Sequence, residues 1–246
     1  MTSQNNLYMP VTSGADTLLI RLRGLAFFDG LDDATLAELA HAARRREYRA
    51  GEVIVLEGEA QPGLYFLDTG YVKVLKSAPS GREQTLRVLE PGDTFNEIGV
   101  FSRLPNPATA VALEPTGVWL IPRETLTGLM RERPDFAQSV IERMAERMLF
   151  LVTLVSDLSL RPVTGRLARL LLETAADDIV QRPRWFTQAE LAARLGTVPD
   201  VVQRSLRGLE ADGLIAVDRA RIRILNRPAL EPVSYTHLTL PTNREV

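Results

Sequence analysis

Turn-forming residues interrupt the chain at short intervals between Tyr48 and Pro122, and this spacing limits what the segment can fold into. The interruptions are Gly51, Gly58, Gly63, Gly70, Gly81, Pro91-Gly92, Pro105-Asn106-Pro107 and Pro115. The runs between them are rich in β-branched and aromatic residues, at positions 53–56, 64–67, 71–75, 85–89, 109–113 and 118–121. Short strands separated by glycine corners are typical of sandwiches, jelly rolls and barrels rather than of βαβ units. The segment is therefore predicted to form an antiparallel β-roll.

Helical patterns flank this β-rich segment on both sides. Before it, residues 31–40 place apolar side chains at helical spacing after two carboxylates, which predicts a short helix packed on the roll. After it, Pro134 and Asp135 mark the start of a longer helix. Its recurring apolar residues are Phe136, Val140, Met144, Met148, Leu151, Val155 and Leu158. A repeat of about 3.5 residues forms either the seam of a two-stranded coiled coil or a stripe that faces the protein's own core.

The last third of the chain has the pattern of three helices followed by a small hairpin. The predicted elements are helices at 163–176, 188–195 and 199–212 and strands at 214–217 and 221–225. Thr187 and Glu190 have the spacing of a capping box, in which the hydroxyl accepts from a backbone N–H and the carboxylate reaches back to the cap. Gly196 and Gly213 follow the second and third helices as stop signals. Two helices joined by a tight glycine-containing turn predict a helix-turn-helix, and the hairpin predicts a wing.

Charge is distributed unequally between the two parts of the chain. Residues 1–160 carry 16 basic and 21 acidic side chains, a net charge of −5. Residues 161–230 carry 12 arginines and 8 acidic side chains, a net charge of +4. A basic domain attached to an acidic one indicates a polyanionic partner such as double-stranded DNA, and a solvated basic face is the alternative.

The composition argues against most enzymatic chemistries. A length of 246 residues, with 45% hydrophobic and 24% charged, suits two modest folded domains. The chain has no cysteine and only two histidines, His41 and His237. Thiolate metal sites and cysteine nucleophiles are thereby excluded, and a histidine metal site or a Ser-His-Asp triad would depend on a single histidine. We therefore expect neither an enzyme nor a metal or cofactor. No signal peptide or membrane-spanning run is present, which predicts a cytoplasmic location and no membrane partner.

Two stretches of the sequence resemble one known family. They are GLYFLDTGYVKVLKSAPSGREQTLRVLEPGDTFNEIGVF and TQAELAARLGTVPDVVQRSLRGLEADGLI. In this order, with a heptad helix between them, the chain resembles the Crp/Fnr family of bacterial transcription regulators. The resemblance implies an α+β fold with an N-terminal antiparallel β-roll of the jelly-roll, cyclic-nucleotide-binding type, a long dimerisation helix and a C-terminal winged helix-turn-helix. The implied divisions are an extension at 1–25, an effector roll at 26–133, the dimerisation helix at 134–160, the DNA-binding domain at 161–230 and a non-native tail at 231–246.

The resemblance also implies a homodimer whose axis is the long helix, with its seam at the seven apolar positions from Phe136 to Leu158. Two recognition helices would then lie about 34 Å apart, so that the operator is expected to be an inverted repeat. RNA polymerase is a further expected partner, with the protein acting as activator or repressor.

Roles on the recognition helix follow from the same resemblance. Arg204 matches the family's base-reading arginine, whose planar fork bonds guanine O6 and N7. Asp200 stands where the family commonly has a glutamate that accepts from a cytosine amino group, and Pro199 replaces a second base-reading arginine. The alternative roles are a solvated helix arginine and a carboxylate placed for the helix dipole. The residues expected to contact phosphates or flanking positions are Thr187, Gln188, Gln203 and Arg207.

The effector pocket departs from the family's cyclic-nucleotide pattern. In members that bind cyclic nucleotides, a Gly-Glu pair is followed ten residues later by an arginine for the cyclic phosphate and then by a small hydroxyl residue. Here the pair is Asn96-Glu97, and the later positions hold Pro107 and Ala108. A cyclic phosphate would lose its bidentate partner, so cyclic AMP and cyclic GMP are not expected ligands. The candidate pocket residues are Asn96, Glu97, Arg103, Ala108 and Thr109.

Two interpretations of the roll follow from this departure. In the first, it responds to an unidentified small-molecule effector, with Glu97 as a contact and Arg103 as a substitute for the missing arginine. In the second, Glu97 caps a short turn, and a vestigial, ligand-free roll accompanies a domain that binds DNA constitutively.

Overall fold

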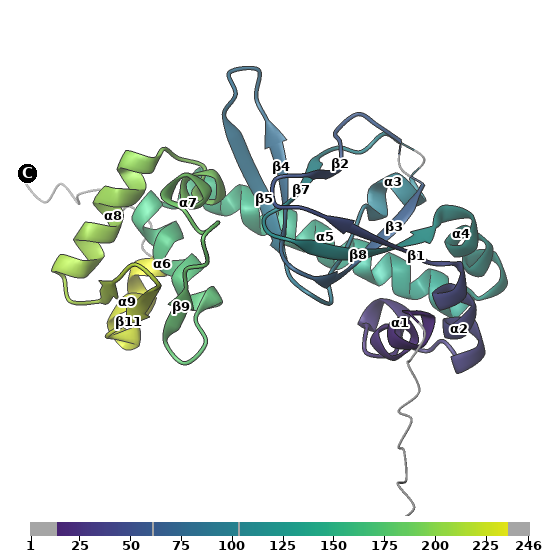
Figure 1. The fold of residues 1–246 in the computed structure, drawn as a ribbon. Coiled ribbons are helices and arrows are strands. Elements are labelled where there is room, and N and C mark those ends of the chain that lie inside the picture. The colour runs from purple at the N-terminus through teal and green to yellow at the C-terminus, as the bar shows by residue number, and fades with distance from the viewer. Residues whose placement is uncertain (1–13, 61, 103, 236–246) are drawn as a thin grey trace, which may run out of the picture.

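The computed structural model describes residues 14–60, 62–102 and 104–235 as a β-roll and a smaller helical domain joined by one long helix (Figure 1). This arrangement confirms the predicted α+β class. The elements of the larger domain are α1 (Gly14–Arg23), η1 (Ala26–Phe28), α2 (Asp33–Ala42), β1 (Arg44–Tyr48), β2 (Val53–Val55), β3 (Gly63–Thr69), β4 (Val72–Ser77), β5 (Glu83–Leu89), β6 (Thr94–Phe95), α3 (Glu97–Phe101), β7 (Thr109–Ala112), β8 (Thr116–Pro122) and α4 (Arg123–Glu132).

Two antiparallel four-stranded sheets form the roll, in the strand orders β1-β8-β3-β6 and β2-β7-β4-β5. The paired central strands β3 and β8 are buried on both faces. Tyr65 and its partner Leu120 pack between the sheets, whereas Phe66 and its partner Trp119 pack in the cluster that includes the helices. Burial on both faces explains why these two strands are continuously apolar instead of alternating. Strand β1 was missed by the sequence prediction because its side chains are charged and mostly exposed.

Helix α1 belongs to the roll. Leu18 and Leu22 are fully buried in the same cluster as Phe27 and Phe28. The predicted division between residues 25 and 26 therefore falls within one packed unit, from residue 14 onwards.

Helix α5 (Pro134–Leu160) begins inside the core of the roll and continues beyond it (Figure 1). Phe136 is fully buried, with its ring centroid 6.0 Å from those of Phe27 and Phe28. Val140, one turn later, is buried in the same cluster. The prediction of a dimer seam is therefore wrong for Phe136 and Val140, because both side chains are occupied by the protein's own core.

Asp32 caps α2 and ties it to the start of α5. Its carboxylate accepts hydrogen bonds from the Thr35 backbone N–H at 2.8 Å and from Arg133 Nη1 at 3.0 Å. These bonds, with that of the Thr35 backbone the strongest, lower the pKa of Asp32 to about 2.

We expect Asp32→Asn to lower the melting temperature at neutral pH and the difference from the unsubstituted chain to shrink as the pH falls towards 2. A carboxylate whose pKa is depressed stabilises the folded state above its ordinary value of 3.8, and that contribution is lost as the pH falls through the folded value. Melting curves by circular dichroism from pH 7 to pH 2 measure the difference. Asp29→Asn is the control, because no hydrogen bond or ion pair within the described ranges involves Asp29. If the melting temperature of Asp32→Asn differs from that of the unsubstituted chain by the same amount at every pH, the stabilising role of the ionised Asp32 carboxylate is wrong.

The smaller domain is built on a three-stranded antiparallel sheet of order β10-β11-β9, with helices packed against it. Its elements are α6 (Val163–Thr174), β9 (Ile179–Gln181), α7 (Gln188–Leu195), α8 (Pro199–Ala211), β10 (Ile215–Val217), β11 (Arg221–Ile224) and α9 (Arg227–Tyr235). The predicted division between residues 230 and 231 falls inside α9, where Leu230 and Ser234 are both buried. The Ser234 carbonyl accepts a hydrogen bond from Arg161. The remainder of the predicted tail, 236–246, lies outside the described residues, and His237 with it.

Candidate nucleic-acid interface and effector cavity

Local signals define the helix-turn-helix. The Thr187 hydroxyl accepts from the Glu190 backbone N–H at 3.1 Å and caps α7. Gly196 ends this helix in a left-handed conformation, with φ of 62°. The predicted capping box is only half formed, because the Thr187 N–H donates to the Trp185 carbonyl at 2.8 Å. The Glu190 carboxylate points away from the cap and contacts the roll.

Helix α8 buries one face and exposes the opposite one. Its buried residues are Val202, Ser205, Leu206 and Leu209. Asp200, Arg204 and Arg207 are exposed, and Gln203 is partly exposed. Gln203, Arg204 and Arg207 lie three, four and seven residues after Asp200, so the four side chains share one face of the helix. The structure thus brings together the four residues predicted on α8, and their roles in reading bases or phosphates stay predictions.

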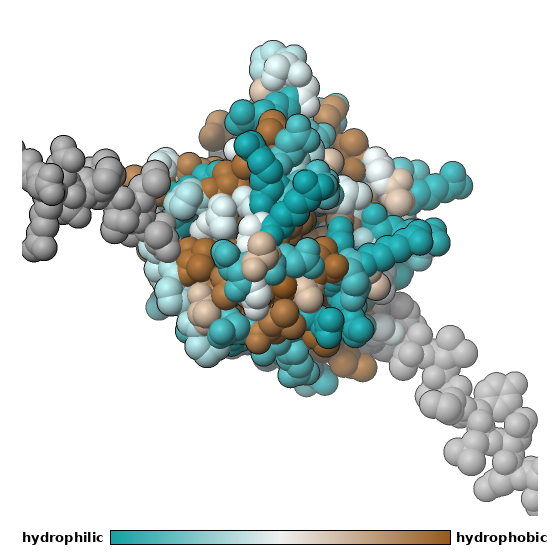
Figure 2. Space-filling model, turned by 90° about the vertical axis from the view of Figure 1, so that its left-hand side faces the viewer, coloured by the Kyte–Doolittle hydropathy of each residue, from teal (hydrophilic) through white to brown (hydrophobic). Residues whose placement is uncertain are grey.

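The face of α8 is free to meet a partner. No ion pair among the described residues includes Arg204 or Arg207. Figure 2 looks onto the end of the molecule that carries this domain, where hydrophilic side chains project outwards. At the start of α7, Thr187 is exposed and Gln188 partly exposed, in line with the flanking contacts predicted for them.

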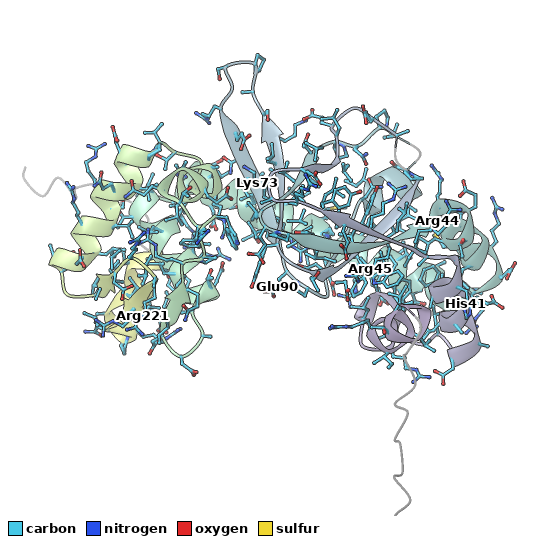
Figure 3. The ribbon with its side chains drawn as sticks, in the orientation of Figure 1. His41, Arg44, Arg45, Lys73, Glu90 and Arg221 are labelled. Atoms are coloured by element: carbon cyan, nitrogen blue, oxygen red, sulfur yellow. The ribbon has the colours of Figure 1, made fainter. Side chains whose placement is uncertain are left out.

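The wing adds arginines that the sequence prediction missed. In β11, Arg221 and Arg223 are exposed and alternate with buried isoleucines (Figure 3 labels Arg221). Arg219 is exposed in the preceding turn. Arg221 Nε pairs with Asp218 at 3.2 Å. The alternation Arg-Ile-Arg-Ile is the signal that could have identified this strand as an arginine-bearing edge of the interface.

A cavity of about 470 Å³ lies between η1, the turn from β5 to β6, and the middle of α5. Its charged lining residues are Arg87, Asp93, Glu97, Arg143, Glu146 and Arg147, and its large apolar ones are Leu25, Phe27, Met144 and Phe150. Of the predicted pocket residues, Glu97 lines this cavity, whereas Asn96, Ala108 and Thr109 do not. Arg103 lies outside the described residues. This cavity is built on α5 and β5 rather than on the loop before β7, and the role of the predicted pocket residues in binding an effector stays a prediction.

Two polar residues of the predicted pocket, Asn96 and Thr109, form hydrogen bonds elsewhere in the roll. Asn96 adopts a left-handed conformation with φ of 74°, and its Nδ2 donates to the Gly63 carbonyl at 2.7 Å. The Thr109 hydroxyl accepts from the Glu57 backbone N–H at 3.1 Å. Both side chains hold loops of the roll in place.

Charged groups in the cavity are arranged around Glu97 and Arg87. Thr94 Oγ1 donates to Glu97 Oε1 at 2.8 Å, and Arg147 Nη2 donates to the same oxygen at 3.1 Å. Burial raises the pKa of Glu97. Arg87 Nη2 binds Asp93 at 2.5 Å, while its buried Nη1 has no hydrogen-bond partner within the described part of the chain. A buried donor without an acceptor is costly to the folded state.

An exposed apolar stripe on α5 includes Met148 and Val155 of the predicted seam. The stripe residues and their exposed fractions are Ile141 (66%), Met148 (65%), Val152 (58%) and Val155 (63%). Their spacing of seven, four and three is that of heptad core positions. Of the other predicted seam residues, Leu151 is exposed, Met144 lines the cavity, and Leu158 lies next to Gly196. Ile141 and Val152 were missed because apolar residues are so frequent on α5 that two stripes interleave.

None of the helices in the described ranges is long and apolar enough to span a bilayer. Within the same ranges, no group of three or more His, Cys, Asp or Glu side chains is arranged to hold a metal ion.

Comparison with known proteins places both domains. The cyclic nucleotide-binding domain family matches residues 45–133, and the Crp-like helix-turn-helix domain family matches residues 165–233. The cAMP-activated global transcriptional regulator Vfr of Pseudomonas aeruginosa is 31% identical over 188 residues, which cover 73% of this chain and 87% of Vfr. The cyclic AMP receptor protein of Thermus thermophilus is 26% identical over 214 residues, covering 87% and 99% of the two chains.

A solved structure has a similar fold. The structure of FixK2 from Bradyrhizobium japonicum superposes with a TM-score of 0.71 at 24% identity, covering 78% of this chain and 96% of FixK2. Vfr is described as a transcriptional regulator and the chain matches the Crp-like helix-turn-helix domain family, which confirms the prediction that the chain is not an enzyme. The matching domains, their order and these relatives show that the chain belongs to the Crp/Fnr family of transcription regulators.

Proposed function

We propose that this chain acts in the cytoplasm as a homodimer that binds an inverted-repeat DNA operator and responds to a small molecule bound in its roll. The observation that carries the proposal is the exposed face of α8, where Arg204 and Arg207 lie side by side with no acidic partner among the described residues. Unpaired guanidinium groups on a helix that follows a tight turn fit the edges of bases and the phosphates of a major groove. RNA polymerase is the further partner expected of such a regulator.

The apolar stripe of α5 supports the homodimer. Four large apolar side chains at heptad spacing are more than half exposed, and water contact with such a stripe is unfavourable. A second copy of the same helix, packed in parallel about a two-fold axis, would bury the stripe against its equivalent. The two copies of α8 would then face successive turns of one side of the duplex.

The cavity on β5 and α5 supports response to a small molecule. The relatives named above are described as cAMP-activated or as cyclic AMP receptors, but this chain has Pro107 at the position of the phosphate-binding arginine. The cavity instead combines charged side chains of both signs with large apolar ones, which suits a small polar molecule of another kind. The second candidate function, constitutive DNA binding with a vestigial sensor, is favoured by the loss of that arginine.

The experiment that tests the proposal is selection from a random double-stranded DNA pool with the full chain, without ligand and with an extract of small metabolites. We expect a two-fold inverted repeat to be enriched only when the extract is present together with the protein. Enrichment without extract would replace it by the constitutive alternative. The absence of any repeat under both conditions would overturn the regulator assignment.

We expect cyclic AMP to bind this chain with a dissociation constant no tighter than about 1 mM. The cyclic phosphate finds no arginine at position 107, and the charges of the cavity are largely paired with one another. Isothermal titration calorimetry of the full chain measures this binding, with Vfr, which is described as cAMP-activated, as the positive control. Saturable binding of cyclic AMP at micromolar concentration would contradict the prediction.

A further inference from the structure

The DNA-binding domain is docked on the roll through a buried carboxylate. Glu190 of α7 is only 6% exposed and lies against strand β5 and its neighbour β4. Thr85 Oγ1 donates to Glu190 Oε1 at 3.2 Å, and Lys73 Nζ lies 3.6 Å from Glu190 Oε2. Figure 3 shows Lys73 at the junction of the two domains. Arg194 Nε, one turn further along α7, donates to the same carboxylate at 3.3 Å.

A second contact is aromatic. Trp185, just before α7, donates from Nε1 to Glu114 Oε2 of the roll at 3.1 Å. Its ring centroid lies 5.1 Å from that of Tyr71, and the Arg194 guanidinium lies 5.4 Å above it. Trp185 precedes the capping residue Thr187, and Glu190 follows it, so α7 is held against the roll at both ends of its first turn.

A third contact involves the turn of the helix-turn-helix. Gln84 Nε2 donates to the Arg194 carbonyl at 3.4 Å. A Cβ atom on Gly196 would lie 2.7 Å from Leu158 Cδ2 and 2.9 Å from Gln84 Oε1. A side chain here would displace the ends of the Leu158 and Gln84 side chains, and the left-handed φ of the turn itself favours glycine.

Strand β5 is the outer strand of its sheet, and α7 covers it. An uncovered edge strand exposes unpaired backbone groups, and a helix over the edge protects them. The same strand carries Arg87, which lines the cavity, two residues after Thr85, which holds Glu190. A ligand that moves β5 at Arg87 therefore acts on the strand that holds the DNA-binding domain.

We propose that Glu190 and Thr85 are positioning residues for DNA binding, whose contact holds α7 against β5 and so keeps α8 facing away from the roll. This inference rests on the proposed function. In Figure 1, α8 lies on the side of the smaller domain that faces away from the roll. A dimer must present two such helices at one fixed separation, and a domain free to rotate loses orientation entropy on binding. Separation of α7 from β5 would break the bond from Thr85 to the buried Glu190 carboxylate and leave Arg194 as its partner on the same helix.

The test uses the full chain with two substitutions on opposite sides of the contact, Thr85→Val and Glu190→Gln. Thr85→Val keeps shape and strand preference while removing the hydroxyl donor. Glu83→Gln is the matched control, because Glu83 is the other carboxylate partner of Lys73, at 2.7 Å, and no bond joins it to α7 within the described residues.

Docking is measured on the free protein, without DNA. We expect both substitutions to accelerate backbone hydrogen exchange in β5 about tenfold, the factor that corresponds to about 1.4 kcal/mol. The fluorescence of Trp185, obtained by subtracting the spectrum of the Trp185→Phe variant, should shift to longer wavelength as the ring leaves Tyr71. The control should change neither. Unchanged exchange and fluorescence in Thr85→Val and Glu190→Gln would overturn the docking role.

Operator affinity is then measured with the inverted repeat obtained by selection. We expect a weakening of about tenfold for Thr85→Val and Glu190→Gln and none for Glu83→Gln, with the dimer unaffected in sedimentation. Tighter operator binding by Thr85→Val would overturn the proposal, because the contact would then hold the domain away from DNA. If the unsubstituted chain selects no repeat, the regulator assignment fails, while exchange and fluorescence still decide whether α7 is docked.

Discussion

Arg204→Gln should reduce operator affinity by between about 30-fold and 20,000-fold and should relax the sequence preference at the contacted base pair. A bidentate arginine–guanine contact accounts for about 1–3 kcal/mol of discrimination, and a dimer makes it twice. Arg204 is exposed on the face of α8 opposite the buried Val202 and Leu206, so the substitution leaves the core of the domain intact. Fluorescence anisotropy with the selected repeat and with single-base variants measures both effects.

Arg207→Gln is the matched comparison on the same face. A phosphate contact carries no sequence information, so this variant should weaken binding to all sequences alike and reduce the salt dependence by about one counterion per subunit. If Arg204→Gln behaves in the same way, with its base preference unchanged, then Arg204 contacts the backbone and the base-reading role predicted for it is wrong.

Val155→Glu should dissociate the homodimer, raising its dissociation constant by about 100-fold or more. In a parallel pair of α5 helices, the two introduced carboxylates would face each other in an apolar seam, where each must lose hydration next to a like charge. Sedimentation equilibrium over a range of protein concentrations measures the change. Operator affinity should fall with it, because a monomer reaches only one half-site.

Ile20→Glu is the control for this substitution. Ile20 on α1 and Val155 on α5 have the same exposed fraction, 63%, so the two changes place a charge at equally accessible apolar positions. Only the change on α5 should affect association. A Val155→Glu variant that remains dimeric at the concentration where the unsubstituted chain is dimeric would exclude the stripe of Ile141, Met148, Val152 and Val155 as the seam.

Local signals were sufficient for the main strands of the roll and for the helix-turn-helix. The six β-rich runs between glycine corners correspond to β2, β3, β4, β5, β7 and β8. Thr187 and Gly196 bound α7 as predicted, because a capping hydroxyl and a left-handed glycine act within one helical turn. The face shared by Asp200, Gln203, Arg204 and Arg207 also follows from helical periodicity alone.

Contacts between distant segments decided the rest. Which apolar stripe of α5 faces inwards depends on Phe27 and Phe28, more than one hundred positions earlier, which enclose Phe136. The cavity beside Glu97 could not be predicted from the sequence for the same reason, since its walls come from three separate segments.

Glu190 shows the distinction within a single side chain. Its position three residues after Thr187 predicts a capping carboxylate, and its backbone N–H does complete the cap. Its carboxylate instead binds Thr85, because α7 packs on β5 and a buried charge is stabilised best by the hydrogen-bond donors that surround it there. The sequence by itself determined the apolar strands of the roll, the bounds of α7 and the exposed face of α8, which depend on interactions a few residues apart. Only the tertiary structure decided the partners of Phe136 and Glu190, because those partners are distant in sequence and meet only when the two domains and α5 pack together.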